Sequence, residues 1–299
     1  MIDLCVIVGA TASGKSEVAM RIARAVGGEI VGADSRQIYR GMSVGTAAPD
    51  AAAQREVPHH CVEFLDPEER YSAARYARDA MAAILDIRAR GRRPIVVGGT
   101  GFYVRVLRGG VALGERGDDD LRARIARELH LHPPEFLHDW LALREPQRAA
   151  AIERNDRYRI GRALEIALAP PRDAAAEIPT LLAHGLRFRT FALALPIAEI
   201  DRRIDLRARA MLAGGLLEEA EALGMRAVAA DAVGFPQALA YLRGQSTFDE
   251  TLVALARATR RYARRQIAWF RAEPNVEWLE ADDLVRAAEE ALTVAPTPS

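Results

Sequence analysis

Residues 9–16, GATASGKS, combine the residue types that hold phosphate groups in proteins. Glycines at both ends let backbone N–H groups converge on phosphate oxygens, and Lys15 adds a full positive charge. The loop separates the apolar stretch LCVIV (4–8) from a helical pattern, so a helix N-terminus would add partial positive charge. The expected phosphate-binding residues are Gly9, Ala10, Thr11, Ala12, Ser13, Gly14, Lys15 and Ser16. We expect the Ser16 hydroxyl to bind Mg²⁺; the loop itself specifies a diphosphate or triphosphate and nothing more.

Two further polar side chains stand where apolar runs end. Asp34 closes EIVGAD (29–34), and Thr100 lies in GGTG (98–101) after PIVV. Sites in open parallel sheets gather at the carboxyl ends of strands, so both side chains should lie near the phosphate loop. From the sequence alone, Asp34 could hold Mg²⁺ or act as a base, and Thr100 could cap a turn or contact a ligand.

The elements that would position these residues alternate between strand and helix. Short apolar runs at 3–8, 29–34, 92–99 and 188–196 predict strands, and helical periodicity follows at 16–26 and 72–91. This order predicts an α/β fold with a P-loop core, in which helices flank a parallel sheet. The pattern is wholly helical from 114 to 154, which predicts an inserted helical subdomain. We therefore expect the first part of the core at 1–113, the insertion at 114–154, and the rest of the core at 155–299. The last part should contain the C-terminal helices, with helical runs at 200–223 and 248–270.

Composition excludes several classes of protein. In 299 residues, 41 Lys plus Arg balance 41 Asp plus Glu, so net charge does not indicate a polyanion partner. Cys5 and Cys61 are the only cysteines, and their spacing predicts neither a zinc site nor a disulfide. No segment approaches the roughly 20 apolar residues of a membrane span. We expect a cytoplasmic protein with no membrane partner.

Local charge differs from the average in TRRYARRQIAWFR (259–271). Its five arginines cannot all lie on one narrow helical face, so some should contact phosphate groups. The alternative is a solvated basic helix.

Four more stretches follow the phosphate loop in order: GADSRQIYRGMSVGTAAP (32–49), VPHHCVEFLDPEERYS (57–72), PIVVGGTGFYVRVL (94–107) and 259–271. Together the five motifs resemble the tRNA dimethylallyltransferases, also called tRNA isopentenyltransferases. The resemblance implies that the loop holds the diphosphate of dimethylallyl diphosphate, with Mg²⁺ as cofactor. It implies transfer of the dimethylallyl group to N6 of the adenosine 3′ of the tRNA anticodon. It also implies a monomer whose insertion clamps the anticodon stem.

The resemblance assigns roles to individual residues. Asp34 would be the base, Thr100 would touch the reacting groups, and Lys15 and Arg207 would face the diphosphate. The residues that would contact tRNA are Asp34, Ser35, Arg36, Gln37, Thr100, Arg122, Tyr158, Arg159, Arg162, Gln237 and Arg264. Gln266, in the same stretch as Arg264, is a further binding candidate.

The chain departs from the family pattern in two places that concern tRNA. Glu153 and Arg154 replace the usual HP of HPND, and Asp231 and Pro236 stand where basic residues are usual. We therefore expect intact core chemistry with rearranged tRNA contacts. Three alternatives stay open: an isopentenyltransferase for free adenine nucleotides, a P-loop small-molecule kinase, and a tRNA-binding protein with a degenerate site. The intact Lys15, Ser16 and Asp34 argue against the last.

Overall fold

The computed structural model describes residues 2–110, 119–169, 178–224, 227 and 229–293. The chain forms two compact units, Met1–Val111 with Ile178–Ser299, and Ala112–Glu177. The predicted insertion ended at 154, which is too early. The helix α9 (Arg157–Leu168) buries Ile160 and Leu164 in the core of the second unit, so that unit continues beyond α9.

The first unit contains a six-stranded sheet in the order β3-β2-β4-β1-β5-β6, and all pairs are parallel. Its strands are β1 (Leu4–Val8), β2 (Gly28–Gly32), β3 (His59–His60), β4 (Arg93–Gly98), β5 (Phe188–Leu193) and β6 (Val276–Leu279). The predicted α/β class is confirmed. The two edge strands were not predicted, because one has two residues and the other has four, too few for a clear pattern.

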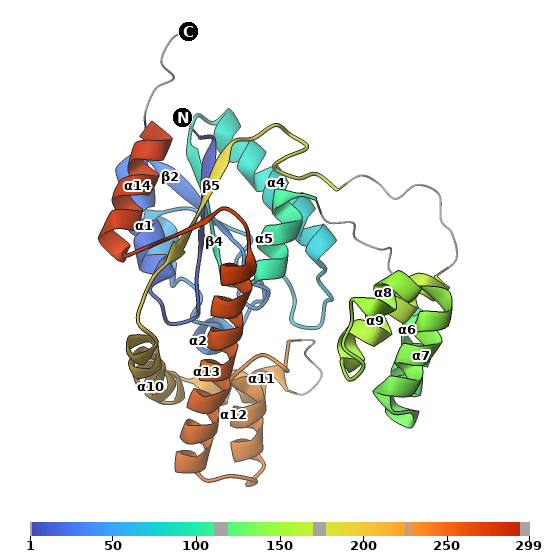
Figure 1. Cartoon of the computed structure of the whole chain (residues 1–299). Coiled ribbons are helices and arrows are strands. Elements are labelled where there is room, and N and C mark those ends of the chain that lie inside the picture. Colours follow the sequence, from blue (N-terminus) through green and yellow to red (C-terminus); the bar gives the residue numbers. More distant parts are fainter. Residues whose placement is uncertain (1, 111–118, 170–177, 225–226, 228, 294–299) are drawn as a thin grey trace. The chain divides into compact units, whose positions relative to one another are not determined.

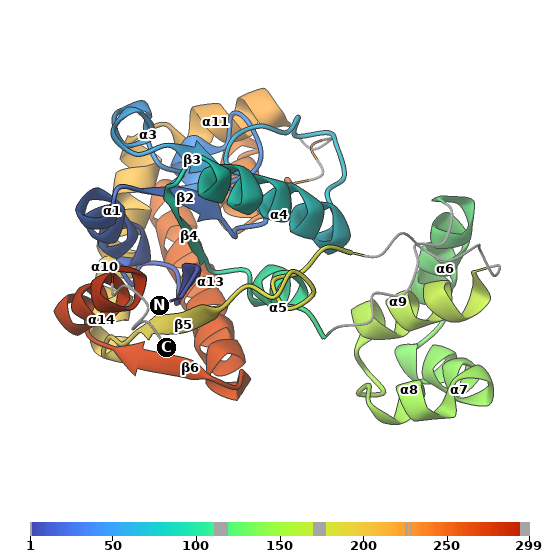
Figure 2. The same ribbon diagram turned by 90° about the horizontal axis from the view of Figure 1, so that it is seen from above.

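Alternate residues of β1 enter two different cores. Leu4, Val6 and Val8 pack with α4 (Ala73–Ala89) and α5 (Gly101–Arg108), whereas Cys5 and Ile7 pack with α1 (Lys15–Val26) and α14 (Ala281–Thr293). Helices thus cover both faces of the sheet (Figures 1 and 2). An apolar run without polar alternation in β1 is typical of a strand buried on both sides.

A layer of helices lies beyond the carboxyl ends of the strands (Figure 1). It contains α10 (Ile197–Ala213), α11 (Leu216–Leu223), α12 (Phe235–Leu242) and α13 (Phe248–Ala272), and the short α2 (Ser43–Thr46) packs against it; α3 (Ala51–Glu56) follows α2. The helical run predicted over 200–223 is broken at Gly214–Gly215, where Gly215 has a φ of 106°. Only glycine adopts this backbone conformation without strain.

The second unit is helical. It consists of α6 (Asp119–Leu131), α7 (Pro134–Arg144), α8 (Pro146–Ala150) and α9, which enclose a core that includes Ile125, Leu137 and Leu141. Across the described ranges of both units, no helix has the length and apolar character needed to cross a bilayer.

Candidate active site

The phosphate loop joins β1 to α1 and has the backbone geometry that its glycines predict. Gly14 has a φ of 100° and precedes the first turn of α1, and Ser13 N–H donates to the Ala10 carbonyl at 3.3 Å. The Ser13 hydroxyl is buried and has no hydrogen-bond partner among the described residues. A buried hydroxyl at a helix N-terminus is suited to donate to a phosphate oxygen.

Lys15 lies under this loop. Its Nζ donates to the Ala10 carbonyl at 3.2 Å. Burial lowers the pKa of Lys15 to about 8, with Asp34 acting in the opposite direction and Arg207 in the same one. Lys15 thus lies close to both a carboxylate and a guanidinium, as the predicted site requires.

The Asp34 carboxylate is held by its own backbone. Oδ1 accepts hydrogen bonds from the N–H groups of Arg36 at 2.9 Å and Gln37 at 3.4 Å. Both of these hydrogen bonds go to Oδ1, and among the described residues Oδ2 accepts none, so one oxygen is fixed and the other is available for chemistry. Asp34, Lys15 and Ser16 line one cavity of about 30 Å³. The Ser16 hydroxyl and the Asp34 carboxylate are hard oxygen donors, which fit Mg²⁺.

Thr100 connects the ends of β2 and β4. Its N–H donates to the Ala33 carbonyl at 3.1 Å, and its Oγ1 accepts from Ser35 N–H at 2.9 Å. The two strand ends approach so closely that a Cβ at Gly98 would lie 2.0 Å from the Ala33 oxygen. The structure therefore brings Asp34, Ser35 and Thr100 together beside the phosphate loop.

Helix α13 contributes two residues to the site: Gln266, which the resemblance made a binding candidate, and Tyr262, which was not predicted. Gln266 is buried; its Oε1 accepts from Thr11 N–H and its Nε2 donates to the Gly99 carbonyl, both at 2.8 Å. Tyr262 lies beside Asp34 and Thr100. Burial, followed by the Asp34 charge, raises the pKa of Tyr262, while a hydrogen bond with Thr100 lowers it. The sequence signal for Tyr262 is its position four residues before Gln266, which places both side chains on one face of the helix.

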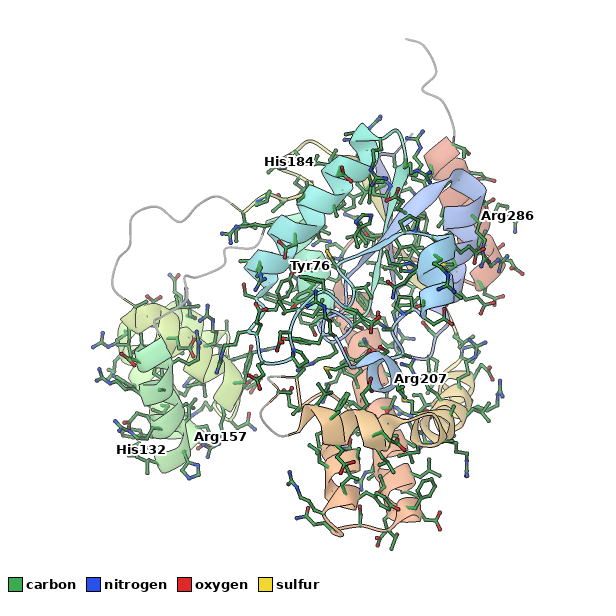
Figure 3. All side chains as sticks on the ribbon, turned by 180° about the vertical axis from the view of Figure 1, so that it is seen from behind. Tyr76, His132, Arg157, His184, Arg207 and Arg286 are labelled. Carbon is green, nitrogen blue, oxygen red and sulfur yellow. The ribbon has the colours of Figure 1, made fainter. Side chains whose placement is uncertain are left out.

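Arg207 projects from α10 (Figure 3), and its Nη2 donates to the Thr46 carbonyl at 3.1 Å. Burial lowers the pKa of Arg207, and the Asp34 charge opposes that shift. The Gln37 amide also binds this segment, because its Nε2 donates to the Thr46 and Ala47 carbonyls at 3.1 and 3.0 Å. The Nε2 group of Gln37 is therefore occupied, and its Oε1 is the atom left for contact with a nucleobase.

The other predicted tRNA contacts of the first unit already have partners within the protein. Arg36 forms an ion pair with Asp231 at 2.9 Å, and Arg264 forms one with Asp201 at 2.8 Å. Gln237 uses its Oε1 to accept from Gly234 N–H at 2.9 Å.

The remaining predicted contacts lie in the second unit. Arg122 and Arg162 approach Glu165 at 3.7 and 2.6 Å, and Arg159 approaches Asp156 at 3.4 Å. Tyr158 exposes 81% of its surface. A large exposed aromatic residue next to arginines is suited to an RNA surface.

The sequence profile described as "IPP transferase" matches residues 37–273 of this chain. The chain belongs to this family. A second profile, "Isopentenyl transferase", matches residues 2–65, which include the phosphate loop and Asp34.

Relatives match the chain over nearly its whole length. It is 45% identical to a tRNA dimethylallyltransferase of Anaeromyxobacter sp. (strain Fw109-5), over 96% of this chain and 98% of the relative. Among solved structures, it is similar to the full-length tRNA isopentenylpyrophosphate transferase of Bacillus halodurans, with a TM-score of 0.70, 34% identity, and coverage of 98% and 96%. It is also similar to a eukaryotic dimethylallyltransferase acting on tRNA, with a TM-score of 0.74, 25% identity, and coverage of 98% and 77%.

Proposed function

We propose that this chain is a tRNA dimethylallyltransferase. It transfers the dimethylallyl group of dimethylallyl diphosphate to N6 of the adenosine 3′ of the tRNA anticodon and releases diphosphate. Membership of the IPP transferase family and the names of its relatives support the reaction type. The geometric support is the meeting of the phosphate loop, Asp34 and Thr100 at one edge of the sheet.

The acceptor side of the reaction requires a base. The adenine N6 amine attacks C1 of the allyl group, the bond from C1 to the diphosphate oxygen breaks, and Asp34 takes a proton from the amine. An exocyclic amine is a poor nucleophile, so proton removal within hydrogen-bond reach is the useful contribution. Asp34 suits this role because Arg36 and Gln37 N–H groups fix Oδ1 and thereby orient Oδ2.

The donor side requires positive charge where the leaving diphosphate becomes more negative. Lys15 and Arg207 supply full charges, and the loop residues from Gly9 to Ser16 supply backbone N–H groups. Ser16 would hold Mg²⁺ through its hydroxyl. When bound, Mg²⁺ would neutralise part of the diphosphate charge.

For the acceptor, Ser35, Arg36 and Gln37 follow the base directly and would contact the target adenosine and its neighbours. Thr100 would orient the reacting groups through its position beside Ser35. The second unit, with Tyr158 and Arg159 exposed, would contact the anticodon stem. We place this activity in the cytoplasm, in a monomer.

The test is incubation of the purified protein with Mg²⁺, dimethylallyl diphosphate and unmodified tRNA that has adenosine 3′ of the anticodon. Nucleoside mass spectrometry should then detect N6-dimethylallyladenosine. Asp34→Asn is the matched variant, because an asparagine Oδ1 still accepts from Arg36 and Gln37 N–H while the negative charge is lost. The variant should fold normally and form no product. Product on AMP in place of tRNA would indicate a free-nucleotide enzyme, and ATP turnover without prenyl product would indicate a kinase.

A further inference from the structure

Five of the six arginines of α13 divide into two rows with different electrostatic surroundings, whereas Arg271 lies over the Trp278 ring. Arg260 and Arg264 face α10, where Arg260 pairs with Asp205 and Arg264 pairs with Asp201 at 2.8 Å. Their charges are already balanced inside the protein. A guanidinium that is neutralised by a fixed carboxylate gains little from a phosphate, because the first contact must be broken or shared.

The other row consists of Arg257, Arg261 and Arg265, at i, i+4 and i+8 on one face of the helix. All three side chains are exposed, and within the described ranges none has an ion pair or a hydrogen bond to a carboxylate. Eight residues of α-helix rise about 12 Å, so the row presents three uncompensated positive charges about one helical turn apart. This is local positive charge in a chain of zero formal net charge.

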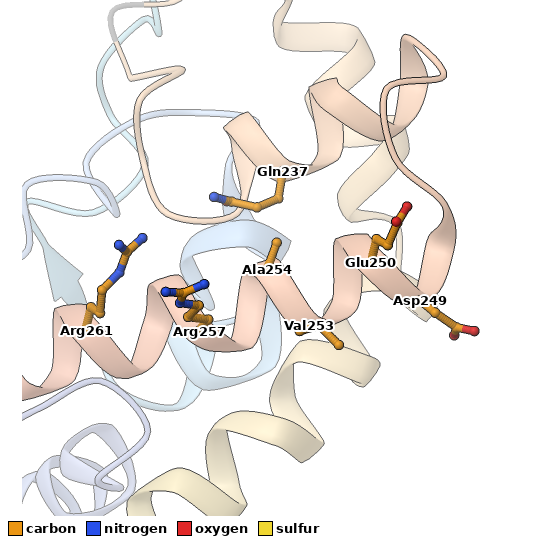
Figure 4. A pocket seen from close by; sticks show the side chains of 7 residues that line it. All are labelled: Gln237, Asp249, Glu250, Val253, Ala254, Arg257 and Arg261. Carbon is orange, nitrogen blue, oxygen red and sulfur yellow. The ribbon is translucent and has the colours of Figure 1, made fainter.

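The row starts in a groove and ends at the active site. Arg257 and Arg261, with Gln237 of α12, line a groove of about 580 Å³ between α12 and α13 (Figure 4). Asp249 and Glu250 line the same groove nearer the start of α13, so its charge changes from negative to positive along the helix towards Arg265. At the other end, the Arg265 guanidinium lies 5.8 Å from the centre of the Tyr262 ring. Tyr262 in turn lies beside Asp34 and Thr100. A strand that follows the row therefore arrives at the proposed base.

We propose that Arg257, Arg261 and Arg265 bind successive backbone phosphates of the single-stranded RNA segment that carries the acceptor adenosine. The proposal rests on the proposed function and specifies which arginines of α13 bind the RNA backbone. Unpaired arginines suit a polyanion, and recognition of RNA loops combines backbone charge with stacking of unstacked bases on aromatic or guanidinium planes. The Tyr262 ring and the Arg265 plane provide such a surface next to Asp34. The groove residue Gln237 would lie along the same strand.

The test compares single glutamine variants on the same helix. Arg257→Gln, Arg261→Gln and Arg265→Gln should each weaken tRNA binding several-fold, and each should reduce the slope of log K against log salt concentration by about 0.7, the value for one phosphate contact on a single strand. Arg260→Gln is the matched control, since Arg260 pairs with Asp205. It should keep the wild-type slope.

Thermal melting should show that every variant is folded, and the KM for dimethylallyl diphosphate should not change in any of the three row variants. Wild-type salt slopes in the row variants, or a reduced slope in Arg260→Gln instead, would overturn the proposal. These outcomes are separate from failure of the proposed function, which would appear as a wild-type protein that forms no dimethylallyladenosine on tRNA.

Discussion

Gln266 ties α13 to both loops of the site. It accepts from Thr11 N–H in the phosphate loop and donates to the Gly99 carbonyl beside Thr100, each at 2.8 Å. Gln266→Met has similar length but can make neither bond. A buried backbone group left without a partner costs about 1–3 kcal/mol. Gly99 is buried and Thr11 is half-buried, so the sum should be about 3 kcal/mol of unfolding free energy.

The substitution should also affect the donor substrate. The Thr11 amide belongs to the loop that would hold the diphosphate, and without Gln266 its orientation is no longer fixed. We expect the KM for dimethylallyl diphosphate to rise about tenfold, equivalent to 1.4 kcal/mol, while the KM for tRNA changes much less.

Urea denaturation and steady-state kinetics check the two effects separately. The matched control is Gln245→Met, the same exchange at an exposed glutamine after α12. A Gln266→Met protein whose unfolding free energy and KM for dimethylallyl diphosphate both stay within error of the control would refute the reasoning.

Three further predictions concern charges. Lys15 is the only lysine of the chain. Lys15→Arg keeps the positive charge, but a guanidinium is too large for the buried position where Lys15 Nζ donates to the Ala10 carbonyl. In steady-state assays, kcat/KM for dimethylallyl diphosphate should therefore fall about 10²-fold or more. Glu29 is 1% exposed, and its hydrogen bonds, first that from Arg90, lower its pKa to about 2. Ionised Glu29 thus stabilises the folded state fully above about pH 4.5, and this stabilisation is lost as pH falls towards 2. By urea denaturation, Glu29→Gln should lower the free energy of unfolding by about 2 kcal/mol at pH 7 and by much less at pH 3. A difference that does not depend on pH would contradict this. Asp231→Asn releases Arg36 from its ion pair, so the KM for tRNA should fall by up to about fivefold, and an increase would contradict this.

The phosphate loop and the strand ends were predictable because their signals are local. GATASGKS requires only its own glycines and the flanking strand and helix, and Asp34 and Thr100 follow apolar runs. The boundary of the helical unit was not predictable in this way. The apolar face of α9 could pack on the sheet or on α6 and α7, and the helical periodicity of its sequence is the same in both cases. The choice depends on which other element offers a complementary apolar surface, and in the structure α6 and α7 do so.

The arginines proposed to bind tRNA show most clearly what a sequence motif leaves out. TRRYARRQIAWFR predicts that its arginines point in different directions, but it does not show which of them meets a carboxylate. That depends on Asp201 and Asp205, which lie about 60 positions earlier on α10 and pair with Arg264 and Arg260 only because the two helices pack together. Resemblance assigned tRNA binding to Arg264, whereas the ion pairs of this chain favour the opposite row. The same reasoning applies to Arg36, which pairs with Asp231 at a position where the resemblance predicts a basic residue. The positive charge that the proposed RNA-binding surface presents therefore depends on which helices pack together. A single carboxylate on a neighbouring element can change that charge while the motif that carries the chemistry stays the same.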